Sequence, residues 1–282
     1  MNGNLKLEKF YIMKTYKEHY KKCKEVSVEK YGSNTPSVYD LRVNDNLLDK
    51  HLNDNYYDLI DTIRVKIDNK IKSMTGCFKD AHAIRVNEWR DINELEELVN
   101  IFMPIVEKEI FGCDAKIEFL HPYRNIPNSY DNGDLKGSWL WHYDDCPPEF
   151  VKLFINLNDV TENSGCLKYL KESDGTIPIL PSARPSPDIV GKQFYPGSRI
   201  PIEVINKKLS LGAEIVNVTG KQGSYAVCTP NIYHTASCPQ VGVEPRDVLF
   251  FFIRPTIKTY NSYLEKTNSY RPVINVKQYE LN

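Results

Sequence analysis

The sequence of 282 residues lacks several features that would each define a class of protein. It contains no apolar run of about 18 residues, so it offers no candidate for a membrane-spanning helix. Its seven cysteines include no C-x-x-C pair, which removes the common zinc-ribbon and redox motifs. Its formal net charge is −1, without the basic excess that nucleic-acid binding requires. We therefore expect a protein with a small-molecule partner and with no membrane or nucleic-acid partner.

What the sequence does contain is the average composition of a folded protein. Hydrophobic residues make up 41% and charged residues 26%, which is enough apolar material for a sizeable core. The N-terminal segment is charged and lacks the apolar stretch of a signal peptide, so we expect a cytoplasmic protein with reduced cysteines. The length lies near the upper end for one domain, and we predict a single domain over residues 1–282. The oligomeric state stays open.

Apolar spacing predicts helices in the first part of the chain. The segment 5–30 has a loose helical pattern, whereas 56–71 mixes helical spacing with an alternating stretch, so its type stays open. Asp91 and Glu94 match an N-cap followed three residues later by a carboxylate. Apolar residues then recur at spacings of three and four, which predicts a helix ending near Gly112.

From about residue 115 the chain changes to short β-prone segments separated by turn residues. Six of them predict an antiparallel sandwich or barrel: 116–120, 151–157, 166–170, 213–218, 224–228 and 247–253. We divide the domain into a helical N-terminal flank over 1–114, a core over 115–258 and a C-terminal tail over 259–282. The proline-rich segment 177–201 has no periodicity. We interpret it as a lid over a site, within an insertion at 173–212, rather than as a disordered loop.

Only one histidine is followed two residues later by a carboxylate, in the pair His142 and Asp144. Side chains at positions i and i+2 of a strand leave the same face, so this pair can provide two ligands to one metal ion. His234, which follows a predicted strand and turn, is the best candidate for the third ligand. Two histidines and one carboxylate leave three positions open on an octahedral metal, as in non-haem Fe(II) oxygenases. The alternative for His142 and Asp144 is a surface pair on a strand.

Arg246 lies at the entry of the apolar strand 248–253. There it can point inward and bind a carboxylate through two parallel hydrogen bonds. Its competitor, Arg254, lies at the far end of the strand, too distant from the metal. Three other arginines either face the pocket and suit an anionic substrate or are solvated: Arg124, Arg184 and Arg199. The remaining histidines have no partner at ligand spacing and are expected to be structural or exposed: His19, His51, His82 and His121.

Taken in order, these motifs resemble a known family. The run Trp-His-x-Asp at 141–144, the strand 151–160, the Asn-Ser-Gly-Cys-Leu turn at 163–167, His234 and Arg246 are similar to the phytanoyl-CoA dioxygenase-like branch of the Fe(II)/2-oxoglutarate-dependent oxygenases. The resemblance covers about 140 residues of the core. It implies a mainly β fold with flanking helices, namely a double-stranded β-helix, which is a cupin-like jelly roll of two facing sheets.

The resemblance also implies roles for individual residues. It makes three residues the catalytic iron ligands: His142, Asp144 and His234. Arg246 would bind the distal carboxylate of 2-oxoglutarate. Relatives often place a serine two residues after the distal histidine, where this chain has Ala236, and the nearest serine is Ser237. An amide that some relatives place ahead of the first ligand falls on Asn125. Ser237 and Asn125 are therefore the further candidates for cosubstrate binding.

The activity implied by the family uses Fe(II), with 2-oxoglutarate and O2 as cosubstrates. It would hydroxylate an unactivated C–H bond of a small molecule and release succinate and CO2. Halogenating relatives have lost the carboxylate ligand, whereas this chain keeps Asp144, which favours hydroxylation. Two alternatives stay open, a non-catalytic cupin-like binding protein and a protein hydroxylase. The full set of ligands argues against the first, and the proline-rich lid suits a small molecule better than a protein.

Overall fold

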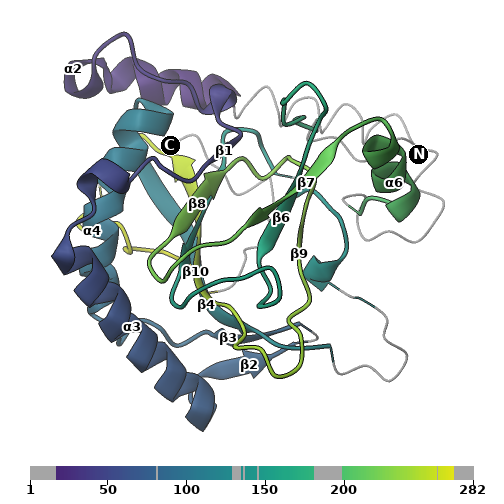
Figure 1. Ribbon diagram of the computed structural model, residues 1–282. Coiled ribbons are helices and arrows are strands. Elements are labelled where there is room, and N and C mark those ends of the chain that lie inside the picture. Colours follow the sequence, from purple (N-terminus) through teal and green to yellow (C-terminus); the bar gives the residue numbers. More distant parts are fainter. Residues whose placement is uncertain are drawn as a thin grey trace, which may run out of the picture.

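The computed structural model describes residues 17–80, 82–128, 135, 137–144, 146–180, 199–258 and 260–269. Two antiparallel sheets form its centre. A seven-stranded sheet has the order β1-β8-β5-β10-β4-β3-β2, and a three-stranded sheet has the order β7-β6-β9. Figure 1 shows the small sheet beside the large one, with helices along the outer side of the large sheet. The mainly β jelly roll with flanking helices that the sequence predicted is therefore confirmed.

The strands have the following bounds. The large sheet contains β1 (Val43–Asn44), β8 (Tyr225–Cys228), β5 (Val151–Asn156), β10 (Asp247–Pro255), β4 (Ala115–Asn125), β3 (Ala83–Val86) and β2 (Cys77–Lys79). The small sheet contains β7 (Glu214–Val218), β6 (Leu167–Lys171) and β9 (His234–Ala236). All six predicted strands are present. The flank over 1–114 was predicted to be helical, but it also contributes the strands β1, β2 and β3. These strands are too short to show a pattern of their own.

The helices of the described residues are mostly N-terminal. They are α2 (Val28–Tyr31), α3 (Asp54–Ser73), α4 (Glu94–Val106) and α6 (Ile202–Ser210). Residues 17–26 are also helical. Short turns are η1 (Val38–Asp40), η2 (Asp49–His51), the π-helical η3 (Glu107–Phe111) and η4 (Gly137–Trp139). None of the helices in the described ranges is long and apolar enough to cross a bilayer.

The open segment 56–71 is a helix because its apolar residues bury one continuous stripe. The stripe consists of Tyr56, Leu59, Ile60, Ile63, Ile67 and Ile71. The side chain of Asn53 caps the helix by accepting a hydrogen bond from the Tyr56 N–H at 3.1 Å. The helix ends where Met74 adopts a left-handed conformation. Cooperative burial of this stripe outweighs the short alternating stretch that left the type open.

The next helix, α4, begins differently from the prediction. Asn93 is its N-cap and makes no side-chain capping bond, while the Asp91 carboxylate pairs with Lys70 of α3 at 2.7 Å. The predicted capping pair of Asp91 and Glu94 is therefore wrong. The predicted end is confirmed, because the helix continues through η3 and stops at Gly112, whose φ of 62° favours glycine.

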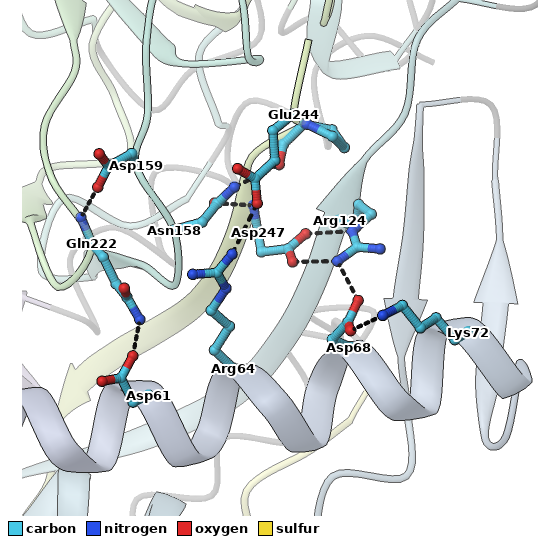
Figure 2. A network of polar contacts seen from close by, with 11 residues as sticks. Asp61, Arg64, Asp68, Lys72, Arg124, Asn158, Asp159, Gln222, Glu244 and Asp247 are labelled. Atoms are coloured by element: carbon cyan, nitrogen blue, oxygen red, sulfur yellow. Dashed lines mark hydrogen bonds and ion pairs between the residues drawn. The ribbon is translucent and has the colours of Figure 1, made fainter. Parts of the chain in front are cut away.

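Helix α3 is tied to the end of the large sheet by the polar network in Figure 2. Arg124 of β4 donates two hydrogen bonds to the Asp247 carboxylate, at 2.7 and 2.6 Å, and one to Asp68 of α3 at 2.9 Å. Arg124 thus faces the helix, and its side chain, which is 22% exposed, is held by these two carboxylates. The network holds Asp247, the first residue of β10, directly beside Arg246.

The C-terminal tail continues the sheet region. Thr267 donates a hydrogen bond through Oγ1 to the carbonyl of Ile117 at 3.0 Å, and the carbonyl of Asn268 accepts one from the Leu120 N–H at 3.1 Å. Residues 270–282 lie outside the described residues. Most of the predicted lid, 181–198 with Arg184, also lies outside them, and the insertion at 173–212 includes helix α6, which was not predicted.

Candidate metal centre

Three side chains with ligand atoms meet between the two sheets. His234 opens β9, and its backbone exchanges two hydrogen bonds with that of His142, at 2.9 and 2.8 Å. The Asp144 N–H donates to the Pro230 carbonyl at 2.9 Å. One ligand atom from each of His142, Asp144 and His234 lies within 4.8 Å of the others, and all three residues are buried. The predicted strand around His142 is only an isolated bridge, yet it still aims both side chains at one point.

Both imidazoles are oriented by backbone carbonyls. Nδ1 of His142 lies 2.7 Å from the Leu140 carbonyl oxygen, and Nδ1 of His234 lies 2.8 Å from that of Ile232. A carbonyl can only accept, so each Nδ1 has the proton and each Nε2 keeps its lone pair. Burial lowers the pKa of His142 to about 4 and that of His234 well below its ordinary range. Two neutral imidazoles beside a carboxylate are a suitable donor set for a divalent metal.

The three residues line one end of a cavity of about 230 Å³. Its walls include aromatic rings from three strands of the large sheet: Phe119, Tyr123, Phe154, Phe250 and Phe252. Its lining contains the cations Arg85, Lys152 and Arg246, but Asp144 is the one carboxylate among the described lining residues. The cavity therefore favours an anionic ligand.

Arg246 is placed in the cavity as predicted. It is 2% exposed, and its Nε donates a hydrogen bond to Oδ1 of Asn156 at 2.8 Å. Its guanidinium carbon lies 5.4 Å from the centre of the Phe154 ring. Within the described ranges it forms no ion pair with an acidic side chain, and burial lowers its pKa. A buried cation of this kind is suited to a carboxylate supplied by a ligand.

Ser237 and Asn125 are not brought to the cavity. The Ser237 hydroxyl donates to the backbone oxygens of Glu162 and Cys166, at 3.1 and 3.3 Å. The Asn125 amide donates to the Gly165 carbonyl at 2.8 Å. Neither residue is among those that line the cavity. Both side chains are bound to the turn that follows β5, and their cosubstrate role remains a prediction.

Two histidines outside the metal cluster line the cavity together with Arg85 of β3. The guanidinium of Arg85 lies 3.3 Å from Nδ1 of His121 and 3.2 Å from Nε2 of His82, and it pairs with Asp80 at 2.6 Å. Neither histidine belongs to the group that can hold a metal, as the sequence predicted. They position a third cation of the cavity instead.

Sequence reasoning missed two cations of the site, Arg85 and Lys152, and Lys152 is the one that contacts the metal cluster. It lies on β5, is 5% exposed, and forms an ion pair with Asp144. Its Nζ also lies 3.0 Å from Nε2 of His234. A signal was present, because a lysine interrupts an otherwise apolar strand of the kind that is buried on both faces. Such a charge needs a buried partner.

Comparisons with known proteins find only distant structural similarity. No protein-family model matches the chain, and no curated protein matches it. A solved structure of the epimerase SnoN in complex with Fe3+, alpha ketoglutarate and nogalamycin RO is 11% identical, with 70% of this chain and 74% of that chain covered and a TM-score of 0.49. EctD from S. alaskensis with bound Fe is 17% identical, with 70% and 68% covered and a TM-score of 0.46. HygX from Streptomyces hygroscopicus with nickel and 2-oxoglutarate is 13% identical, with 77% and 83% covered and a TM-score of 0.45. At these values the function has to be inferred from the chain's own site.

Proposed function

We propose that this protein is an Fe(II)/2-oxoglutarate-dependent dioxygenase of the phytanoyl-CoA dioxygenase-like kind, which hydroxylates a small molecule and releases succinate and CO2. The observation that supports this most is that one cavity contains both a His-Asp-His cluster and the buried Arg246, which forms no ion pair with any acidic residue that the structure describes. Both parts are needed, since one suits the metal and the other suits the far end of a dicarboxylate.

Each group of the site has a distinct task in this proposal. His142, Asp144 and His234 would hold the iron, which together with the keto acid and O2 supplies the oxidising chemistry when bound. Arg246 would bind the distal carboxylate and so orient the keto acid. The aromatic walls would exclude water from the reacting end of the cavity. Because Asp144 is retained, it would occupy the metal position that a halide takes in halogenating relatives.

The charge of the cavity supports a dicarboxylate cosubstrate. Arg85 pairs with Asp80 and Lys152 with Asp144, which leaves Arg246 as the lining cation without an acidic partner among the described residues. Because Arg246 is buried, its attraction for an anion is stronger than it would be at the surface. One carboxylate of 2-oxoglutarate would offset this charge, and the other would be available to the metal.

The test is anaerobic titration with Fe(II) and 2-oxoglutarate, followed by a succinate assay over amino acids, small carboxylates and acyl thioesters. We expect the wild type to bind iron and His142→Ala and Asp144→Ala to lose at least about 100-fold in iron affinity, because each removes a direct ligand. His82→Ala is the matched control, since it removes a cavity histidine outside the cluster. The proposal fails if the wild type binds no Fe(II), or if the two ligand variants bind it like the wild type.

A second candidate function, a non-catalytic binding protein with a cupin-like fold, is favoured by one observation. The Lys152 ammonium forms an ion pair with Asp144 and lies 3.0 Å from Nε2 of His234, so the chain itself places a cation beside these two side chains. That function predicts 2-oxoglutarate binding that is independent of Fe(II), and no succinate with any compound of the panel. The same titration therefore separates the two functions. A protein hydroxylase would instead release succinate only with a protein substrate.

A further inference from the structure

The ammonium of Lys152 lies where two of the three ligand side chains converge. Its Nζ contacts Asp144 and lies 3.0 Å from Nε2 of His234, while that nitrogen and Oδ2 of Asp144 are 3.9 Å apart. Because Nδ1 of His234 donates to the Ile232 carbonyl, Nε2 is free to accept a hydrogen bond from the ammonium. Lys152 thus uses the same lone pairs that a metal would use.

A metal ion and this ammonium cannot occupy the site together. A divalent ion lies roughly 2.0–2.2 Å from an imidazole nitrogen and from a carboxylate oxygen. An ion bound to both His234 and Asp144 would therefore lie within the space that Nζ now fills. Two cations in direct contact repel strongly in a buried site of low effective dielectric constant. Metal binding requires the ammonium to move.

The cavity offers the ammonium a second position. Nζ of Lys152 is already 5.5 Å from the centre of the Phe250 ring and 5.8 Å from that of Phe154, within the range of cation–π attraction. These two rings are stacked, with centroids 4.8 Å apart, and Lys152 lines the same cavity as they do. Rotation of the flexible lysine stem can carry the charge over the rings without exposing it to solvent.

We infer that Lys152 is an internal cation that competes with the metal for Asp144 and His234 and that the bound metal displaces it into the cavity. This rests on the proposed function, because it requires the cluster to bind a metal. The chain therefore contains its own competitor for its metal, and the apparent metal affinity is reduced by the fraction of molecules in which the ammonium holds the site.

The test is calorimetric titration of wild type and variants with Mn²⁺, without keto acid. Lys152→Met keeps the length of the side chain but removes the charge, and we expect its Mn²⁺ affinity to rise by about tenfold or more. Lys152→Arg keeps the cation and should show no such gain. Lys116→Met is the matched control, because Lys116 is also a buried lysine, pairs with Glu118 at 3.4 Å, and does not line the cavity. Its Mn²⁺ affinity should equal that of the wild type.

A structure of the wild type grown with Mn²⁺ tests the same inference if Lys152→Met does not fold. We expect Nζ to be out of contact with both Asp144 and His234. The inference is overturned if Nζ still contacts either residue beside a bound Mn²⁺, or if Lys152→Met binds the ion no more tightly than the wild type does. In both cases Mn²⁺ is bound, so the failure concerns the role of Lys152 and leaves the metal site of the proposed function unaffected. Absence of Mn²⁺ binding in every variant, Lys152→Met included, would overturn both.

Discussion

The two faces of the large sheet are filled in opposite ways, although the same strands form both. On the helix side, Leu153 of β5 and Phe251 of β10 are fully buried in one apolar cluster with α3 and α4. On the other side, their neighbours Lys152 and Phe250 line the cavity. One face is packed solid and stabilises the fold, whereas the other keeps open space and buried charge. A single residue step along a strand thus leads from the packed core to the cavity.

The sharpest test of this difference replaces each of two adjacent phenylalanines of β10 by alanine and compares the two variants. Phe251→Ala would leave a void against Phe102, whose ring centre is 4.9 Å away, and should lower the free energy of unfolding by about 3–5 kcal/mol. Phe250→Ala only enlarges an existing cavity and should cost less than about 2 kcal/mol. Denaturant titration of both variants measures the two losses. Equal losses would show that the two faces contribute alike.

The next test removes the charge of the cavity face. Arg246→Met should raise the Kd for 2-oxoglutarate by about 30–150-fold, because charge-assisted hydrogen bonds contribute about 2–3 kcal/mol. Metal affinity should change little, since Arg246 makes no contact with the cluster. Arg254→Met is the control, because Arg254 lies on the same strand but pairs with Glu118 at 2.7 Å outside the cavity. If both variants bind 2-oxoglutarate like the wild type, Arg246 does not bind the cosubstrate.

The smallest expected effect concerns the polar rim that ties α3 to the sheet (Figure 2). Burial alone would raise the pKa of Asp68, but hydrogen bonds from Lys72 and Arg124 outweigh it and hold the pKa below its usual range. The ionised form is therefore stabilised by folding, and this contribution is present above the ordinary aspartate pKa of about 3.9 and is lost as the pH falls through the lower folded value. Asp68→Asn should cost about 1 kcal/mol near neutral pH and less below about pH 4.

Thermal unfolding of Asp68→Asn and wild type between pH 7 and pH 3 measures this effect. The control is Asp61→Asn on the same helix, because Asp61 accepts a hydrogen bond from the neutral Gln222 at 2.7 Å. Its difference from the wild type should change less with pH. A gap between Asp68→Asn and wild type that is constant over the whole range would contradict the role of these ion pairs.

Much of the fold could be predicted because local patterns report directly on it. The stripe of α4 and the apolar run of β10 each reveal their element from residues close together in sequence. The strands β1 and β3 could not be predicted, because two or four residues show no periodicity and become strands only by pairing with a neighbour. Helix α6 was missed for a related reason, since it emerges from a proline-rich segment.

The residues of the site also fall into those that could be predicted from the sequence and those that could not. His142 and Asp144 could be predicted because positions i and i+2 point to one side in extended backbone, even where, as here, the strand is reduced to a bridge. Ser237 and Asn125 could not be placed, because a shift of one residue or a competing backbone carbonyl decides where such a short side chain points. Their hydrogen bonds depend on the turn after β5, which no local pattern describes.

By itself, the sequence determined six of the strands, the helix that ends near Gly112, the His-x-Asp pair and the arginine that directly precedes β10. Only the tertiary structure decided that Lys152 meets Asp144 and His234, and that Arg124 leaves the cavity to bind α3. The physical reason is that sequence patterns report only on residues that are close together along the chain. Periodicity records which face of an element is buried, but the partner across that face is chosen by how the two sheets and the helices close on one another.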